Sequence, residues 1–498
     1  MQGDLYTVHR TLAVNAIRFP ERLALDDGYT SLSYRELDAQ ANRLAHRILA
    51  QGIPQGGHVA ILAGNTVPHV VSLYAAAKAG LVSVILDMKW VAREINQTLE
   101  MFGCKILLMD KAHQSQIDDE TGRLVGGNIL TFDFKTSGFG LDEIAGSWPD
   151  SEPGVPVSGD DTFMLMLTSG TTGRPKGCIK SHKSYLHSCI LNFTSKRMVE
   201  GERELLVVPI YYNSGRSSLI TQLSFAGSVY LRDRFESQEA LQIIQEQRIT
   251  CLALAPNHCS ELLDYPSLKD YDVSSLRVLR KAGLPFQKRL LQSIMENICP
   301  QVFQAYGGTE FSEATVLKPE EQLSKIGSAG LPIWGTEVQV VDHDGNVLPA
   351  GTQGILCVRG PSVCDGYYND PQATKEAFVD GWYRSGDLGF LDEDGYLYIS
   401  GREKNLIKTG GINVAPAEIE DIILSFPEVS DVSVVGVADD RWGTAVKAVV
   451  ALKSGMTLTQ DDLLSRCAEN LSRYKLPKIV EFVEKIPRTA LGKIAPQP

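Results

Sequence analysis

Near the N-terminus the chain alternates amphipathic stretches with short, uniformly apolar runs. Ser33 followed by Glu36 predicts a helix N-terminus in which each side chain caps the backbone of the other residue, and the amphipathic spacing extends this helix to Leu49. A strand, a helix and a second strand are then predicted at Val59–Leu62, His69–Ala79 and Val82–Leu86. Strands separated by helices are typical of parallel sheets covered on both faces.

The alternation continues in the middle of the chain, with elements predicted at Glu204–Pro209, Glu239–Gln247, Thr250–Ala255 and Leu276–Ala282. From Ile326 to Asp387 the pattern changes to short β runs broken by Gly and Asp. The turn sequences Asp342–Asn346 and Asp392–Gly395 each predict a hairpin.

After Gly401 the pattern predicts a separate small unit, with helices near Ala417–Leu424 and Asp461–Leu471 and with three strands. We therefore expect an α/β protein of two domains. Residues 1–404 form a large N-terminal domain of parallel-rich αβ layers plus a β-rich subdomain. Residues 405–498 form a small, mobile C-terminal α/β domain.

Composition narrows the class of protein. The chain has 498 residues, of which 43% are hydrophobic and 22% charged, as in soluble globular proteins. Its formal charge of −12 argues against a broad nucleic-acid surface, which needs clustered Lys and Arg. Nine scattered cysteines without a CxxC pair predict reduced thiols and a cytoplasmic location. The N-terminus does not resemble a signal peptide, and Lys78 interrupts the most apolar stretch, so no membrane span is expected.

The strongest candidate for a functional motif is the segment from Leu167 to Gly177. Its sequence is Leu-Thr-Ser-Gly-Thr-Thr-Gly-Arg-Pro-Lys-Gly. An apolar strand precedes this loop, and a helix is predicted to begin near Ser181. Its glycines let the backbone approach phosphate groups, its hydroxyl groups donate to phosphate oxygens, and its lysine adds positive charge. The spacing is not that of a Walker loop. The predicted phosphate-binding residues are Thr168, Ser169, Gly170, Thr171, Thr172 and Lys176.

This loop resembles the phosphate-binding signature of the adenylate-forming superfamily, which contains acyl- and aryl-CoA synthetases, peptide-synthetase adenylation domains and luciferases. Four further stretches are similar to motifs of that superfamily and follow in its order: Ala305–Glu310, Tyr383–Asp387, Gly401–Glu420 and Pro487–Ile494. The resemblance covers nearly the whole chain. It implies that ATP activates a carboxylic acid to an acyl-AMP with release of pyrophosphate, and that the acyl group then passes to an acceptor.

The resemblance also implies a catalytic role for three matching residues. Lys493 would bridge the substrate carboxylate and the α-phosphate, Thr309 would donate to the α-phosphate, and Glu310 would hold Mg²⁺. Positioned cations and donors are the main requirement, because the reaction brings two anions together.

The remaining matches concern the nucleotide and the conformational cycle. Tyr306 would stack on adenine, Asp387 would accept both ribose hydroxyl groups, and Arg402 would contact ribose or phosphate. The base pocket would be completed by Gly283, Leu284, Pro285 and Gly307. Lys404 stands at the hinge of the superfamily, and Gly410 and Gly411 would let a thin pantetheine arm pass close to the backbone.

Two segments depart from the family pattern, and both concern the acid. Tyr212 stands where relatives commonly have a histidine, and Lys281 begins a stretch that is usually Ser-Gly-Gly-Ala-Pro. The predicted acyl pocket contains Tyr212, Asn213, Arg216, Lys281, Ala282 and Gly308. Arg216 and Lys281 supply positive charge for a keto, hydroxyl or second carboxylate group. Alternatively, the two cations point to solvent or pair with acidic neighbours.

The function implied by the resemblance is that of an acyl- or aryl-CoA ligase that uses ATP, Mg²⁺ and CoA. One alternative is a stand-alone ligase that transfers the acyl group to an amino acid amine or a carrier protein. Another is an inactive nucleotide-binding relative, against which the joint presence of Lys176, Glu310, Asp387 and Lys493 argues. The expected partners are a small carboxylic acid, the acceptor and, for the assembly, a second copy in a homodimer.

Overall fold

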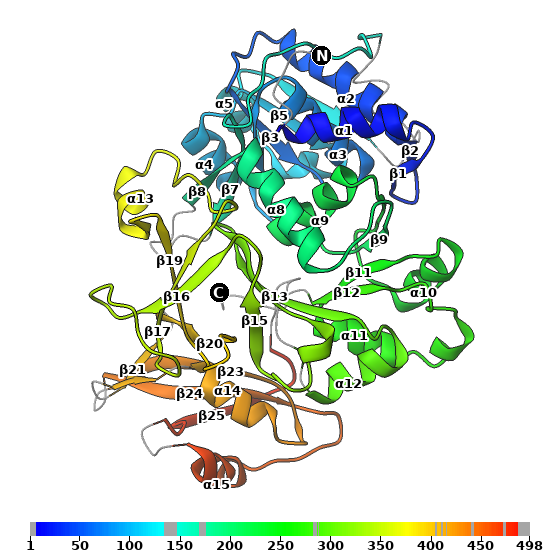
Figure 1. Ribbon diagram of the computed structural model, residues 1–498. Coiled ribbons are helices and arrows are strands. Elements are labelled where there is room, and N and C mark those ends of the chain that lie inside the picture. The colour runs from blue at the N-terminus through cyan, green and yellow to red at the C-terminus, as the bar shows by residue number, and fades with distance from the viewer. Residues whose placement is uncertain are drawn as a thin grey trace. The chain divides into compact units, whose positions relative to one another are not determined.

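The computed structural model describes residues 6–133, 147–168, 176–281, 286, 288–403, 406–409, 412–414, 416–439, 443–471 and 475–486 (Figure 1). The chain divides into two compact units. The first unit contains residues 1–326, 332–337 and 359–383, and the second contains residues 327–331, 338–358 and 384–498. The domain boundary predicted at Lys404 lies outside the described residues and stays a prediction.

One sheet of the first unit has the strand order β6-β5-β3-β4-β7-β8. These strands are β6 (Ile129–Phe132), β5 (Ile106–Asp110), β3 (His58–Leu62), β4 (Val82–Ile85), β7 (Thr162–Thr168) and β8 (Lys176–Ser181). Neighbouring strands are parallel except β7 and β8, which form an antiparallel pair. All residues of β4 and β5 are buried, which explains why both strands are apolar except at Ser83 and Asp110. Strand β8 was not predicted.

Helices of this region are α1 (Val8–Arg18), α2 (Tyr34–Leu49), α3 (Val67–Lys78), α4 (Ala92–Phe102), α5 (Asp119–Leu124) and α8 (His182–Ser195). The capping box at the start of α2 is confirmed. The Ser33 N–H group donates to the Glu36 carboxylate at 2.8 Å, and the Glu36 N–H group donates to Ser33 Oγ at 3.3 Å. Every residue of α3 is buried.

A second run of strands in the first unit has the order β14-β13-β12-β11-β9-β10-β1-β2. The strands are β14 (Ser312–Leu317), β13 (Val302–Gly308), β12 (Val278–Lys281), β11 (Cys251–Leu254), β9 (Arg203–Leu206), β10 (Ser228–Leu231), β1 (Leu23–Asp26) and β2 (Ser31–Ser33). From β13 to β1 neighbouring strands are parallel, and the two end pairs are antiparallel. The predicted alternation of strands and helices is therefore confirmed here.

Helices α9 (Asn213–Ser224), α10 (Ser237–Glu246), α11 (Pro256–Leu263) and α12 (Lys288–Asn297) connect these strands, and α13 (Pro371–Ala377) precedes the short β18 (Phe378–Val379). Helices α8 and α9 pack against each other. Buried residues of α10, α11 and α12 form one apolar core with β9, β11 and β12. The carboxyl ends of the parallel strands are thus held in fixed positions.

The second unit contains a run of strands in the order β16-β17-β19-β20-β15. These are β16 (Glu337–Val341), β17 (Gly354–Arg359), β19 (Trp382–Leu391), β20 (Leu397–Arg402) and β15 (Ser328–Pro332). Both predicted turns are confirmed. The Gly345 N–H group donates to Asp342 O at 3.2 Å, the Gly395 N–H group donates to Asp392 O at 3.0 Å, and both glycines have positive φ angles.

The C-terminal part of this unit has a three-stranded sheet, β23 (Val429–Asp439), β24 (Gly443–Leu452) and β25 (Ile479–Val483). Helices α14 (Pro416–Leu424) and α15 (Gln460–Asn470) share an apolar core with this sheet, and β21 (Ile407–Thr409) pairs with β22 (Ile412–Val414). The predicted α/β class is confirmed. Among the described helices, none combines the length and apolar character that a membrane crossing requires.

Candidate active site

The predicted phosphate loop joins two paired strands. Thr168 ends β7 and is the register partner of Lys176, which begins β8. Ser169, Gly170, Thr171 and Thr172 lie outside the described residues, and their roles stay predictions. Ser181 caps α8 by accepting a hydrogen bond from the Ser184 N–H group, so the helix predicted near Ser181 is confirmed.

Lys176 lies next to an aromatic residue that sequence reasoning missed. Its ammonium nitrogen is 4.9 Å from the centroid of the Tyr367 ring, a distance at which a cation interacts with the ring face. The Tyr367 hydroxyl group donates a hydrogen bond of 3.0 Å to Glu310 Oε1. Burial and the nearby Glu310 carboxylate raise the pKa of Tyr367, so its hydroxyl group stays protonated and acts as a donor. One tyrosine therefore connects the predicted phosphate-binding lysine with the predicted metal-binding glutamate.

Glu310 itself lies in the turn between β13 and β14, together with Thr309. The two glycines before this turn are required by close packing. A Cβ atom on Gly307 would lie 2.1 Å from Ser312 O, and one on Gly308 would lie 2.5 Å from the Phe311 ring. The Tyr306 ring is 5.3 Å from the Phe311 ring and is partly exposed, as an adenine-stacking residue needs to be.

The segment Ser362–Tyr368 supports both the loop strand and the acidic turn. The Ile179 N–H group donates to Gly366 O at 2.9 Å, and the Cys364 N–H group donates to Glu310 O at 2.7 Å. The buried Lys180 ammonium group donates to Ser362 O, and burial lowers the pKa of this lysine. No sequence pattern distinguished this segment, because its contacts come from residues far away in the chain.

The predicted ribose-binding residues lie in the second unit. Asp387 on β19 is the register partner of Arg402 on β20, and Arg402 Nε donates to Asp387 Oδ1 at 2.7 Å. The Asp387 side chain is 9% exposed, and Arg402 supplies an ion-pair partner for its largely buried carboxylate. Ser385 Oγ donates to Leu356 O at 2.9 Å and accepts from the Asp387 N–H group at 3.1 Å.

Three residues assigned to the acyl pocket, Tyr212, Asn213 and Arg216, lie at the start of α9. Tyr212 precedes the helix, and its ring is 4.5 Å from the Tyr211 ring. Asn213 is the first helical residue, and Gly215 packs so closely that a Cβ atom there would lie 2.4 Å from Pro209 O. Burial, with the nearby Asp87, raises the pKa of Tyr212.

The two pocket cations differ in their environments. Arg216 is 3% exposed, and its Nη1 atom donates to Ile210 O at 3.1 Å and Tyr211 O at 3.2 Å. Among the described residues it forms no ion pair, so the expectation that it points to solvent or pairs with an acid is wrong for Arg216. Lys281 is the last residue of β12 and is half-buried.

Several predicted residues lie outside the described part of the chain, and their roles stay predictions: Ala282, Gly283, Leu284, Pro285, Lys404, Gly410, Gly411 and Lys493.

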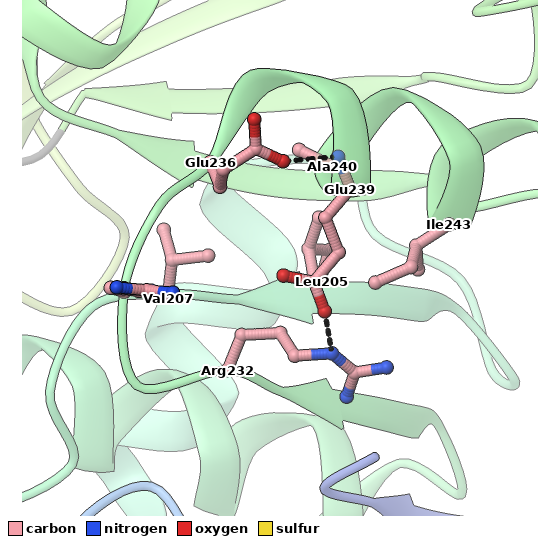
Figure 2. Close-up of a pocket in the computed structure, with 8 residues that line it drawn as sticks. Leu205, Val207, Arg232, Glu236, Glu239, Ala240 and Ile243 are labelled. Atoms are coloured by element: carbon pink, nitrogen blue, oxygen red, sulfur yellow. Dashed lines mark hydrogen bonds and ion pairs between the residues drawn. The ribbon is translucent and has the colours of Figure 1, made fainter.

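A hollow elsewhere in the first unit is not a candidate site. Figure 2 shows its lining, which comes from β9, α10 and the residues that follow β9 and β10. Arg232 Nε donates to Glu239 Oε1 at 2.8 Å, and the Glu236 carboxylate accepts from the Glu239 N–H group at 2.7 Å. These charged groups stabilise the start of α10.

Comparison with known proteins identifies the family. Residues 12–368 match the AMP-binding enzyme domain, and residues 418–493 match the AMP-binding enzyme C-terminal domain. A feruloyl-CoA synthase from Amycolatopsis sp is 34% identical over 95% of this chain and 94% of its own length. A 2-succinylbenzoate–CoA ligase from Bacillus licheniformis is 32% identical over 95% of this chain and 96% of its own length.

Solved structures agree with these matches. The crystal structure of ATP-bound MatB from Rhodopseudomonas palustris has a TM-score of 0.91 at 28% identity and covers 98% of this chain and 97% of its own. The o-succinylbenzoate CoA synthetase from Bacillus subtilis, in complex with ATP and magnesium ion, has a TM-score of 0.85 at 30% identity over 97% and 98% of the two chains. The chain therefore belongs to the AMP-binding enzyme family, and its resemblance to the adenylate-forming acid–CoA ligases is confirmed.

Proposed function

We propose that the residues described above activate a carboxylic acid with ATP and transfer the acyl group to CoA. The protein is an AMP-forming acid–thiol ligase. In the first step a carboxylate oxygen of the acid attacks the α-phosphorus, and pyrophosphate leaves. In the second step the CoA thiol attacks the acyl carbon, and AMP leaves with a proton released. The family match and the CoA ligases among the relatives support this assignment.

The observation that carries the proposal is the arrangement around Tyr367. Lys176 lies against the ring of this tyrosine, and Glu310 accepts a hydrogen bond from its hydroxyl group. A fixed cation and a fixed carboxylate are what ATP phosphates with a bound metal ion require. Lys176 is assigned to the phosphates, Tyr306 to adenine, and Asp387 with Arg402 to ribose. Lys493 is assigned to the bond-forming step, with Thr309 as a donor to the α-phosphate.

Mg²⁺ is the cofactor that we assign to Glu310. In nucleotide sites this ion is held by one or two carboxylates together with substrate phosphates, and it neutralises charge that develops on phosphate oxygens. Tyr367 donates to Glu310 Oε1, and within the described part of the chain the other carboxylate oxygen accepts no hydrogen bond that would keep it from a metal. The solved relative with ATP and magnesium ion supports the choice of metal.

The test separates the two half-reactions. A panel of acids is assayed for ATP–pyrophosphate exchange and then for product formation with CoA, with amino acids and with a carrier protein. Exchange followed by thioester formation with CoA is the expected result. Exchange with transfer only to an amine or a carrier protein would replace CoA as the acceptor, and the absence of exchange with every acid would refute the function.

We expect the protein to be located in the cytoplasm. We also expect a homodimer, which sedimentation velocity would test.

A further inference from the structure

The charged side chains around β12 form internal ion pairs, with one exception. Arg280 donates to Glu204 and to Ser218. Lys196, which follows the end of α8, donates to Glu313 on β14 and, at 2.8 Å, to Asn192 Oδ1. Lys281 is the exception, since its ammonium group makes no hydrogen bond or ion pair with any part of the chain that the structure describes.

Arg216 has a different environment from Lys281. The Arg216 guanidinium group is almost wholly buried and is fixed by two backbone carbonyl groups of the loop before α9. It therefore holds that loop against the helix. Lys281 has no such attachment, and it lies at the carboxyl end of a parallel strand, beside Leu254 of β11. In open α/β sheets, ligands bind at this edge.

The charges near Lys281 do not balance. The nearby cations are Lys281 itself, Arg280 from its own strand and Lys196 just after α8. The nearby carboxylates are Glu313 from β14 and Glu204 from β9. Both carboxylates are already paired with the other two cations. Although the Lys281 side chain is only half-buried, desolvation lowers the pKa of its ammonium group to about 8. The negative charge of Glu313 acts in the opposite direction and raises this pKa.

We propose that Lys281 is a specificity-determining residue whose ammonium group binds a second carboxylate on the acid being activated. This inference rests on the proposed function and names its substrate class, a dicarboxylic acid. The second carboxylate supplies the counter-charge that the described side chains lack. An acid with an apolar tail would leave a desolvated cation unpaired, which is unfavourable.

The test compares acids that differ only in the second carboxylate: pentanoate with glutarate, and benzoate with isophthalate. Thioester formation is measured for the wild type, Lys281→Met, Lys281→Arg and the control Lys183→Met, which removes an exposed lysine 3.8 Å from Asp160. Loss of a hydrogen bond to a charged group corresponds to a roughly ten- to hundredfold change in binding affinity. We expect Lys281→Met to raise the KM of the diacids by this factor while the monoacids change less than about twofold.

The dependence of KM on pH distinguishes charge recognition by Lys281 from a purely structural role, which would not change with the protonation of its ammonium group. Lys281 is protonated below pH 8, so the wild-type KM for a diacid should be constant there and should rise as the pH increases through about 8. Lys281→Arg keeps its charge and should retain diacid selectivity with a flat profile over this range.

Three outcomes would overturn the inference. They are equal losses for monoacids and diacids in Lys281→Met, no change for either class, or a raised KM for ATP with an unchanged KM for the acid. All three are compatible with full ligase activity of the wild type. The proposed function fails by a different result, the absence of pyrophosphate exchange with every acid in folded wild-type protein.

Discussion

The hydroxyl group of Tyr367 donates a hydrogen bond of 3.0 Å to the carboxylate of Glu310. The two residues are far apart in the chain, and the Lys176 ammonium group lies against the same tyrosine ring. The phenol thus links the carboxylate in the β13–β14 turn to the lysine at the start of β8.

Tyr367→Phe should lower kcat roughly tenfold and should also lower Tm, because the hydrogen bond to the charged Glu310 contributes about 1.5–3 kcal/mol. Pyrophosphate exchange measures the first effect, and thermal unfolding measures the second. Tyr368→Phe is the matched control, since its ring packs against His58 and Phe102. Full activity in Tyr367→Phe would show that Glu310 keeps its position without the phenol.

Glu310→Gln should raise the Mg²⁺ concentration needed for half-maximal exchange, by roughly tenfold, because one carboxylate charge is lost from the metal site. A Mg²⁺ titration of the exchange rate measures this shift. An unchanged requirement for metal would make Glu310 a structural residue of the β13–β14 turn.

Lys493→Ala should abolish adenylate formation and spare thioester formation from supplied acyl-adenylate. A lysine charge close to two anions is worth a few kcal/mol at an effective dielectric of about 20, which corresponds to a rate loss of roughly two to three orders of magnitude. Measuring the two half-reactions separately checks this division. Equal losses in both steps would contradict the assigned role.

Gly307→Ala should destabilise the first unit by about 1–3 kcal/mol, because the new methyl group would overlap Ser312 O at 2.1 Å. The measurement is Tm by thermal unfolding. Gly122→Ala in α5 is the control, since nothing lies within 4 Å of its added Cβ atom. The control should keep or slightly raise Tm, as alanine favours helix. Equal Tm values for both variants would show that the β13–β14 turn relaxes freely.

Local chemistry made much of the fold predictable. Ser33 and Glu36 cap α2 as predicted, because capping depends on residues three positions apart. The glycines of both predicted hairpin turns adopt the positive φ angles that only glycine reaches easily. The motif containing Tyr306 and Glu310 was identified from consecutive residues, and the structure places it in one strand and its following turn.

The alternation of strands and helices, the capped helix end, the glycine turns and the motif residues could be predicted from the sequence, because each depends on neighbours within a few positions. The contacts of Tyr367 with Glu310 and Lys176 could not be predicted, since they depend on how distant segments pack together. The tertiary structure also separated two cations that looked equivalent: Arg216 is fixed by backbone carbonyl groups, whereas Lys281 has no partner among the described residues. The physical reason is that hydrogen bonds and desolvation depend on which distant segments pack together, and hydrophobic periodicity does not specify the partners of an individual polar atom.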